Sequence, residues 1–164
     1  MADFYFAIEN HCRLEMSGFC DSDFASTQGR RSTSGYIFLL GNGVISWSSK
    51  LQPTVATSTA KAEYMALAAA IKEALWLRHL LHDLGVGVRA VPLICDSSVC
   101  IAMLASPVSS ARTKHIDICH HFAHERVERD EIRMIQCTTT EQVTDTFTKA
   151  LPKEKLRFCI SAWT

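Results

Sequence analysis

The chain has 164 residues, 48% of them hydrophobic and 21% charged, a balance that excludes an intrinsically disordered chain. Lys and Arg together number 17, as do Asp and Glu, so the formal net charge is zero. A free-standing nucleic-acid-binding domain is usually basic. A nucleic-acid role would therefore predict weak binding by this chain alone, or dependence on a covalently attached neighbour.

Seven cysteines without a CxxC pair indicate free thiols in a reducing compartment. The first residues (MADFYFAIEN) lack the basic segment and apolar run of a signal peptide, and no long uncharged apolar stretch predicts a membrane span. We therefore expect an intracellular protein, cytoplasmic or nuclear and not secreted, with no membrane partner.

The first part of the chain predicts three strands. Residues 1–17 have the weakest pattern and lead into a strand expected to end near residues 19–21. Two β-rich runs follow at 35–40 and 44–47, and Trp47 on the second is expected in the core rather than as a base-stacking platform. The Asn-Gly step of Gly41-Asn42-Gly43 between them is a strong hairpin signal.

From Thr57 the apolar period changes to that of a helix, which we expect to run to Leu84 and to end at Gly85 and Gly87. Its predicted apolar face consists of Tyr64, Leu67, Ala68, Ile71, Leu75 and Leu80.

The second part alternates strands and helices. Further strands are expected at 91–95 and 132–137, and helices at 97–104, 112–129, 140–151 and 155–163. A hairpin unit followed by this alternation predicts an α/β fold with a mixed sheet and helices on both faces.

Acidic residues stand at the boundaries of these elements. Asp21 ends the first strand and Asp96 follows the strand at 91–95, while Glu63 lies in the first or second turn of the long helix and Asp145 lies on the helix after the last strand. A single Asp at a strand end is usually a turn former. Four such acids suggest a site for two Mg²⁺ ions, which need several converging carboxylates.

Seven sequence blocks follow one another along the chain: GFCDSDFA (18–25), RRSTSGY (30–36), ISWSSK (45–50), STAKAEYMAL (58–67), CDSS (95–98), RTKHIDI (112–118) and TDTFTKAL (144–151). In this order they resemble the ribonuclease H domains of copia-type retrotransposons. The resemblance implies a single ribonuclease H-like domain over 18–164, with a five-stranded mixed sheet of three antiparallel and then parallel strands. Residues 1–17 are not covered by it.

The resemblance implies that Asp21, Glu63, Asp96 and Asp145 are the catalytic residues and hold two Mg²⁺ or Mn²⁺ ions, with Asp23 as an alternative to Asp21. Glu73, further along the helix, is expected to face solvent. The implied activity is cleavage of the RNA strand of RNA/DNA hybrids during reverse transcription, leaving 5′-phosphate and 3′-hydroxyl ends, without a small-molecule cofactor. The implied partners are the hybrid and a reverse transcriptase domain of the parent polyprotein, within a retroelement particle.

Candidate nucleic-acid contacts lie at two places. Ser58 and Thr59 are natural N-cap residues, and a helix N-terminus also suits a phosphate. Arg112, Lys114 and His115 form a basic cluster that suits a nucleic-acid backbone or a solvated helix start. The histidines at 115, 120 and 124, with Cys119, also permit a zinc hypothesis, but their spacing does not favour it.

Two departures from the family pattern favour an alternative. Lys61 stands where the family has Glu, and 138–141 (TTTE) lacks the His that many ribonucleases H carry there. With the neutral charge, they suit a non-catalytic or domesticated binding or assembly module that kept the fold. A related two-metal nuclease of the integrase kind is a third hypothesis, which the block matches disfavour.

Overall fold

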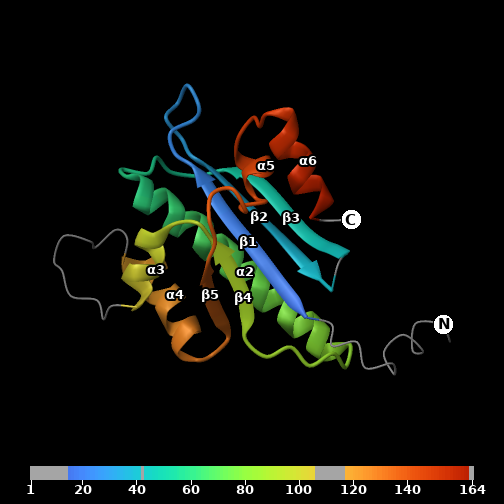
Figure 1. Cartoon of the computed structure of the whole chain (residues 1–164). Coiled ribbons are helices and arrows are strands. Elements are labelled where there is room, and N and C mark those ends of the chain that lie inside the picture. Colours follow the sequence, from blue (N-terminus) through green and yellow to red (C-terminus); the bar gives the residue numbers. More distant parts are fainter. Residues whose placement is uncertain (1–14, 42, 106–116, 163–164) are drawn as a thin grey trace.

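A five-stranded sheet organises the chain (Figure 1). The computed structural model describes residues 15–41, 43–105 and 117–162. Its strands are β1 (Met16–Asp23), β2 (Thr33–Leu40), β3 (Gly43–Leu51), β4 (Val91–Cys95) and β5 (Ile132–Gln136). Its helices are α2 (Thr59–Asp83), α3 (Ser98–Ala105), α4 (Asp117–Glu128), α5 (Asp145–Thr148) and α6 (Lys153–Ser161).

The sheet has the order β3-β2-β1-β4-β5. The pairs β3–β2 and β2–β1 are antiparallel, whereas β1–β4 and β4–β5 are parallel. The predicted mixed sheet is thus confirmed. Because β1 and β4 are parallel neighbours, their carboxyl ends, which carry Asp21 and Asp96, lie at the same edge of the sheet.

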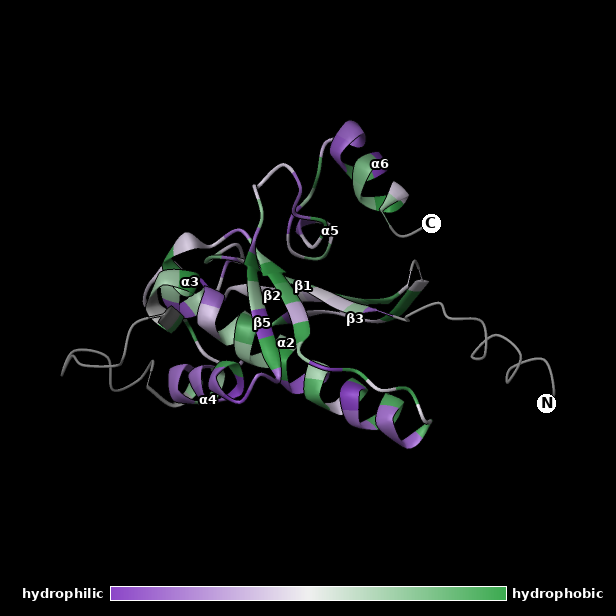
Figure 2. Ribbon diagram, turned by 60° about the horizontal axis from the view of Figure 1, so that its bottom comes forward, coloured by the Kyte–Doolittle hydropathy of each residue, from purple (hydrophilic) through white to green (hydrophobic). Residues whose placement is uncertain are grey.

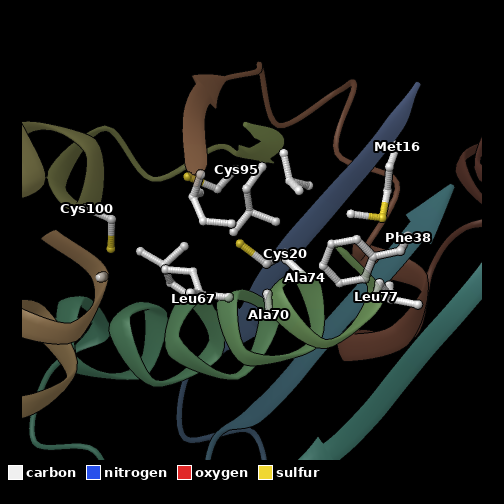
Figure 3. Close-up of a cluster of buried hydrophobic side chains, with 14 of the residues drawn as sticks. Met16, Cys20, Phe38, Leu67, Ala70, Ala74, Leu77, Cys95 and Cys100 are labelled. Atoms are coloured by element: carbon white, nitrogen blue, oxygen red, sulfur yellow. The ribbon is translucent and has the colours of Figure 1, made fainter. Parts of the chain in front are cut away.

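One face of the sheet is covered by α2, α3 and α4, and it holds the larger core (Figures 1 and 2). Side chains of α2 such as Leu67, Ala70 and Leu77 pack here against Cys20 of β1 and Phe38 of β2 (Figure 3). Small residues on α2 bring its axis close to the strands. This core fixes the helix that carries Glu63 against the strand that carries Asp21.

The ends of α2 are set by local signals in the sequence. The Ser58 hydroxyl accepts a hydrogen bond from the backbone N–H of Lys61 at 3.2 Å, as an N-cap does. Gly85 has φ +81°, the left-handed conformation that favours glycine after a helix. Leu80, expected on the apolar face, is 41% exposed, since Leu77 and Leu81 face the core instead.

The opposite face is covered by α5 and α6, which are far apart from α2 in Figure 2. Ile37 of β2, Val143 and Cys159 of α6 form a small second core there, with Phe19 of β1 packed against it. Residues 19 and 37 lie one position before the core residues Cys20 and Phe38, so strand alternation sends them to this other face. None of the helices in the described ranges has the length and hydrophobicity to cross a membrane.

Two further expectations from the sequence are wrong. Residues 140–151 do not form one helix; only Asp145–Thr148 is helical in that range. The reason is tertiary, because Gln142 is fully buried and donates to the backbone carbonyl of Cys20 at 2.9 Å, which a continuous helix would prevent. Trp47, expected in the core, is 63% exposed because it lies on the edge strand β3.

Candidate active site

Asp21 is the most deeply placed of the four acids. It lies within β1, two residues before the strand ends, and its exposed fraction is 2%. Its Oδ2 accepts a 2.5 Å hydrogen bond from the hydroxyl of Thr148 and lies 3.4 Å from Nζ of Lys149. Both partners come from the end of α5, so the second core positions the groups that surround this carboxylate.

Gly35 allows α5 to approach the sheet this closely. It pairs with Asp21 across the β1–β2 ladder. A Cβ atom at position 35 would lie 2.8 Å from Cγ2 of Thr148 and 3.0 Å from Cβ of Phe147. The hydroxyl of Ser49 on β3 also donates to the Phe147 carbonyl at 2.5 Å. The glycine therefore leaves the space in which Thr148 reaches Asp21.

Asp145 begins α5 and is also buried, with 4% of its surface exposed. Its Oδ1 accepts a 2.7 Å hydrogen bond from Lys149, one turn later. Its Oδ2 lies 3.9 Å from Nζ of Lys155. Lys149 thus contacts two of the four acids at once, Asp21 and Asp145.

Asp96 follows β4 directly and is half-buried. Its Oδ2 accepts a hydrogen bond from the hydroxyl of Thr139 at 3.2 Å. Thr139 belongs to the segment that joins β5 to α5, where sequence reasoning noted the missing His. Lys155 donates to the carbonyls of Thr139 and Thr140 at 2.8 and 2.5 Å, and Glu141 accepts from Thr138, so the segment is held in place.

Glu63 lies in the second turn of α2, half-buried. Burial first, and then the negative charges of Asp21 and Asp96, raise the pKa of its carboxyl to about 8, against the lowering effects of Ser22 and Lys149. Burial likewise raises the pKa of Asp21 to about 6 against the lowering effects of Thr148 and Lys149, with Asp145 and Asp96 adding to the rise. The four acids therefore share one electrostatic environment, in which the positive charge of Lys149 only partly offsets burial and the mutual repulsion of the carboxylates.

Burial lowers the pKa of Lys149, but Asp145 and Asp21 outweigh it and raise the pKa above the ordinary lysine value. This ammonium is therefore charged. It is a cation held at the place where two of the acids meet.

The donor set suits Mg²⁺ or Mn²⁺, because all four acids supply hard oxygen ligands. Burial and neighbouring acids also raise the pKa values of Asp21 and Glu63, a cost that a bound cation would offset. Within the described part of the chain, no group of three or more His, Cys, Asp or Glu side chains is arranged to hold a metal ion as it stands. A divalent ion would need the ammonium of Lys149 to leave the carboxylates it now contacts.

The structure places the other predicted residues as follows. Asp23, the alternative to Asp21, ends β1 and is half-buried, so it lies beyond the buried position. Glu73 does not simply face solvent, since it accepts a 2.6 Å hydrogen bond from the hydroxyl of Ser46 on β3. Ser58 and Thr59 are exposed at the start of α2. Arg112, Lys114 and His115 lie outside the described residues.

Helix α4 carries two of the histidines of the zinc hypothesis, His120 and His124. His120 is buried and its ring lies 5.5 Å from that of Tyr64 and 6.0 Å from that of His124. His124 Nδ1 lies 3.5 Å from Glu128. These contacts give the two histidines packing roles.

Sequence reasoning missed several residues that shape the site: Gly35, Thr139, Gln142, Thr148 and Lys149. Thr148 and Lys149 stand inside the matched block at 144–151, and Gly35 inside the block at 30–36. That match was the one signal that could have drawn attention to them.

Comparisons with known proteins agree with this fold and with the block pattern. The chain is 37% identical over 145 residues to the retrovirus-related Pol polyprotein from transposon TNT 1-94 of Nicotiana tabacum, covering 88% of this chain and 11% of that protein. It is 37% identical over 142 residues to the corresponding polyprotein from transposon RE1 of Arabidopsis thaliana, covering 85% and 10%. The chain therefore spans about a tenth of the length of these relatives. No protein-family model matches it.

Among solved structures, the chain resembles ribonuclease H1 of the halophilic archaeon Halobacterium salinarum, with a TM-score of 0.62, 16% identity, and coverage of 82% of this chain and 94% of that one. A similar likeness holds for LC11-RNase H1 in complex with an RNA/DNA hybrid, at TM-score 0.60, 16% identity, 82% and 94%. The fold is that of ribonuclease H. The chain's homologues are the Pol polyproteins of copia-type retrotransposons, which confirms the resemblance seen in the sequence.

Proposed function

We propose that this chain is a hybrid-specific endoribonuclease that cuts the RNA strand of RNA/DNA duplexes during reverse transcription. The observation that carries the proposal is the gathering of Asp21, Glu63, Asp96 and Asp145 into one electrostatic environment at one edge of a ribonuclease H fold. The solved relative that holds an RNA/DNA hybrid supports the substrate.

In this proposal the four carboxylates hold two Mg²⁺ or Mn²⁺ ions. When bound, such a pair supplies a water activated for in-line attack on the RNA phosphate and stabilises the departing 3′ oxygen, which leaves 5′-phosphate and 3′-hydroxyl ends. Thr148 orients Asp21 through its 2.5 Å hydrogen bond. Thr139 does the same for Asp96.

Substrate contacts are proposed at the start of α2. The free backbone N–H groups there, beside the exposed Ser58 and Thr59, suit a phosphate of the DNA strand. Lys61 keeps the cap, since its backbone N–H bonds to Ser58, and its side chain adds a positive charge near that phosphate. The basic residues 112, 114 and 115 complete the proposed backbone contacts. Selection of RNA would rest on 2′-hydroxyl contacts and hybrid shape rather than on base sequence.

We further propose that the domain works beside a reverse transcriptase within a polyprotein, inside a retroelement particle. The match to a Pol polyprotein of a transposon supports this proposal. A neighbour of that kind would also supply the positive charge that this neutral chain lacks.

Cleavage of matched substrates tests the proposal. The protein is incubated with Mg²⁺ or Mn²⁺ and end-labelled RNA/DNA hybrid, duplex RNA or duplex DNA, beside Asp96→Asn and the control Asp83→Asn, an exposed acid at the far end of α2. We expect cleavage of the hybrid alone, lost in Asp96→Asn and kept in Asp83→Asn. Absence of cleavage of all three substrates would favour the non-catalytic module, and cleavage of duplex DNA would favour a different nuclease.

A further inference from the structure

Lys149 stands out because it is a cation placed among acids that the proposed function assigns to metal ions. Its Nζ lies 2.7 Å from Oδ1 of Asp145 and 3.4 Å from Oδ2 of Asp21. Both carboxylates are almost completely buried, at 4% and 2% exposed. A buried carboxylate pair without a positive partner would repel strongly. The ammonium therefore neutralises the two acids from a position between them.

The fold delivers Lys149 to this position from a fixed backbone. Its backbone N–H donates to the carbonyl of Asp145 at 2.9 Å and closes the single turn of α5. That turn is seated on β2 at Gly35. The side chain is 35% exposed, so the ammonium can move into solvent without any rearrangement of the core.

We propose that Lys149 is a resident counter-ion that holds Asp21 and Asp145 together in the metal-free protein and that a divalent cation must displace. This inference rests on the proposed function, because it takes these acids to be metal ligands. An ammonium and a divalent ion cannot share the same carboxylate oxygens, since their positive charges repel. Lys149 thereby sets how much cation the site requires and keeps the empty site folded.

Thermal unfolding without nucleic acid tests this, with Mg²⁺ or Mn²⁺ titrated from zero to tens of millimolar. Lys149→Met keeps the length of the side chain and removes its charge. The matched control is Lys72→Met, which removes an exposed lysine more than two turns beyond Glu63 along α2.

Without metal, we expect Lys149→Met to melt about 2–6 °C below the wild type, because the acid pair loses its counter-ion. With metal, its half-saturating cation concentration should fall roughly three- to tenfold, because the competitor is gone. The control should leave the half-saturating cation concentration unchanged and lower the melting temperature only slightly, because Lys72 loses its cation–π contact with Phe122. Lys149→Arg, whose planar guanidinium can bridge two carboxylates, should need at least as much cation as the wild type.

The outcomes separate the two ideas. A wild-type melting temperature that does not respond to either cation would overturn the proposed metal site and this inference with it. A wild type that responds, with Lys149→Met requiring the same or more cation or melting higher without it, would overturn the inference alone. If Lys149→Met does not fold, Lys149→Arg still tests the inference. A half-saturating cation concentration lower in Lys149→Arg than in the wild type would overturn it.

Discussion

Thr148 donates a 2.5 Å hydrogen bond from its hydroxyl to Oδ2 of Asp21, a residue 127 positions earlier in the chain. The bond joins the central strand β1, near the start of the chain, to the short helix α5, near its end. It ties one proposed metal ligand to the helix that carries another, Asp145. Stability and chemistry at this site should therefore respond to the same substitutions.

Thr148→Val tests that bond, since valine keeps the shape and removes the hydroxyl. A buried carboxylate that loses a donor costs about 1–3 kcal/mol of unfolding free energy. Loss of an orienting partner should also reduce hybrid cleavage about tenfold or more. Urea unfolding and cleavage rates check both. The control is Thr146→Val, because the Thr146 hydroxyl donates only to the Val143 carbonyl, at 3.1 Å. Equal effects of the two variants would contradict the role of Thr148 in orienting Asp21.

Gly35→Ala should act through space rather than through charge. The added methyl group would lie 2.8 Å from Cγ2 of Thr148 and would push α5 away from β2. We expect a loss of about 1–3 kcal/mol in unfolding free energy, together with weaker cleavage. Gly87→Ala is the control, because a Cβ atom there meets nothing within 4 Å. A Gly35→Ala protein as stable and active as Gly87→Ala would mean that α5 is not held this closely.

Gln142→Leu probes the segment that replaces the expected long helix. Gln142 donates to the Cys20 carbonyl at 2.9 Å and accepts from the Thr144 hydroxyl at 2.8 Å, all buried. Leucine fills the same volume and leaves both partners unpaired, so we expect a loss of about 2 kcal/mol. Gln136→Leu, exposed at the end of β5, should change little. Chemical denaturation measures the stability of the two variants. Equal midpoints would contradict the stabilising role of the Gln142 hydrogen bonds.

The metal-free protein should lose stability as pH rises from about 4 to about 8. The pKa values of Asp21 and Glu63 are raised in the folded state to about 6 and about 8, from 3.8 and 4.5. In this window the folded state binds more protons than the unfolded state, so the unfolding free energy falls with pH. Denaturation at several pH values in chelator measures the slope.

Glu63→Gln should flatten the upper part of that slope, because its titration is removed. Saturating Mg²⁺ should flatten it too, since a bound cation favours the ionised acids. A slope that is the same in Glu63→Gln as in the wild type would contradict the electrostatic coupling of Glu63 to the other acids.

Local signals predicted most of the framework. The Asn-Gly hairpin, the helix from its Ser58 cap to Gly85 and the apolar run before Asp96 each depend on neighbouring residues, and all three are present. The mixed sheet was predicted from the order of the elements, and its three antiparallel and then parallel strands from the family resemblance. Asp21, Glu63 and Asp96 therefore lie on the predicted elements, whereas Asp145 begins the short helix α5 instead of lying inside a helix over 140–151.

The errors lie where long-range contacts decide. Gln142 interrupts the predicted helix because its side chain donates to the backbone of Cys20 on β1, and Glu73 accepts a hydrogen bond from Ser46 on the edge strand β3. Neither contact can be predicted from neighbouring residues in the sequence. Lys149 resembles any surface lysine in the sequence. Only the folded chain shows that it sits between two buried acids.

A crystal structure grown with Mn²⁺ tests the proposed metal site, because anomalous scattering locates the ions. We expect manganese bound among the oxygens of Asp21, Glu63, Asp96 and Asp145, with Nζ of Lys149 withdrawn from the two acids it contacts now. Saturating Mn²⁺ that binds elsewhere, with Lys149 still between Asp21 and Asp145, would contradict it.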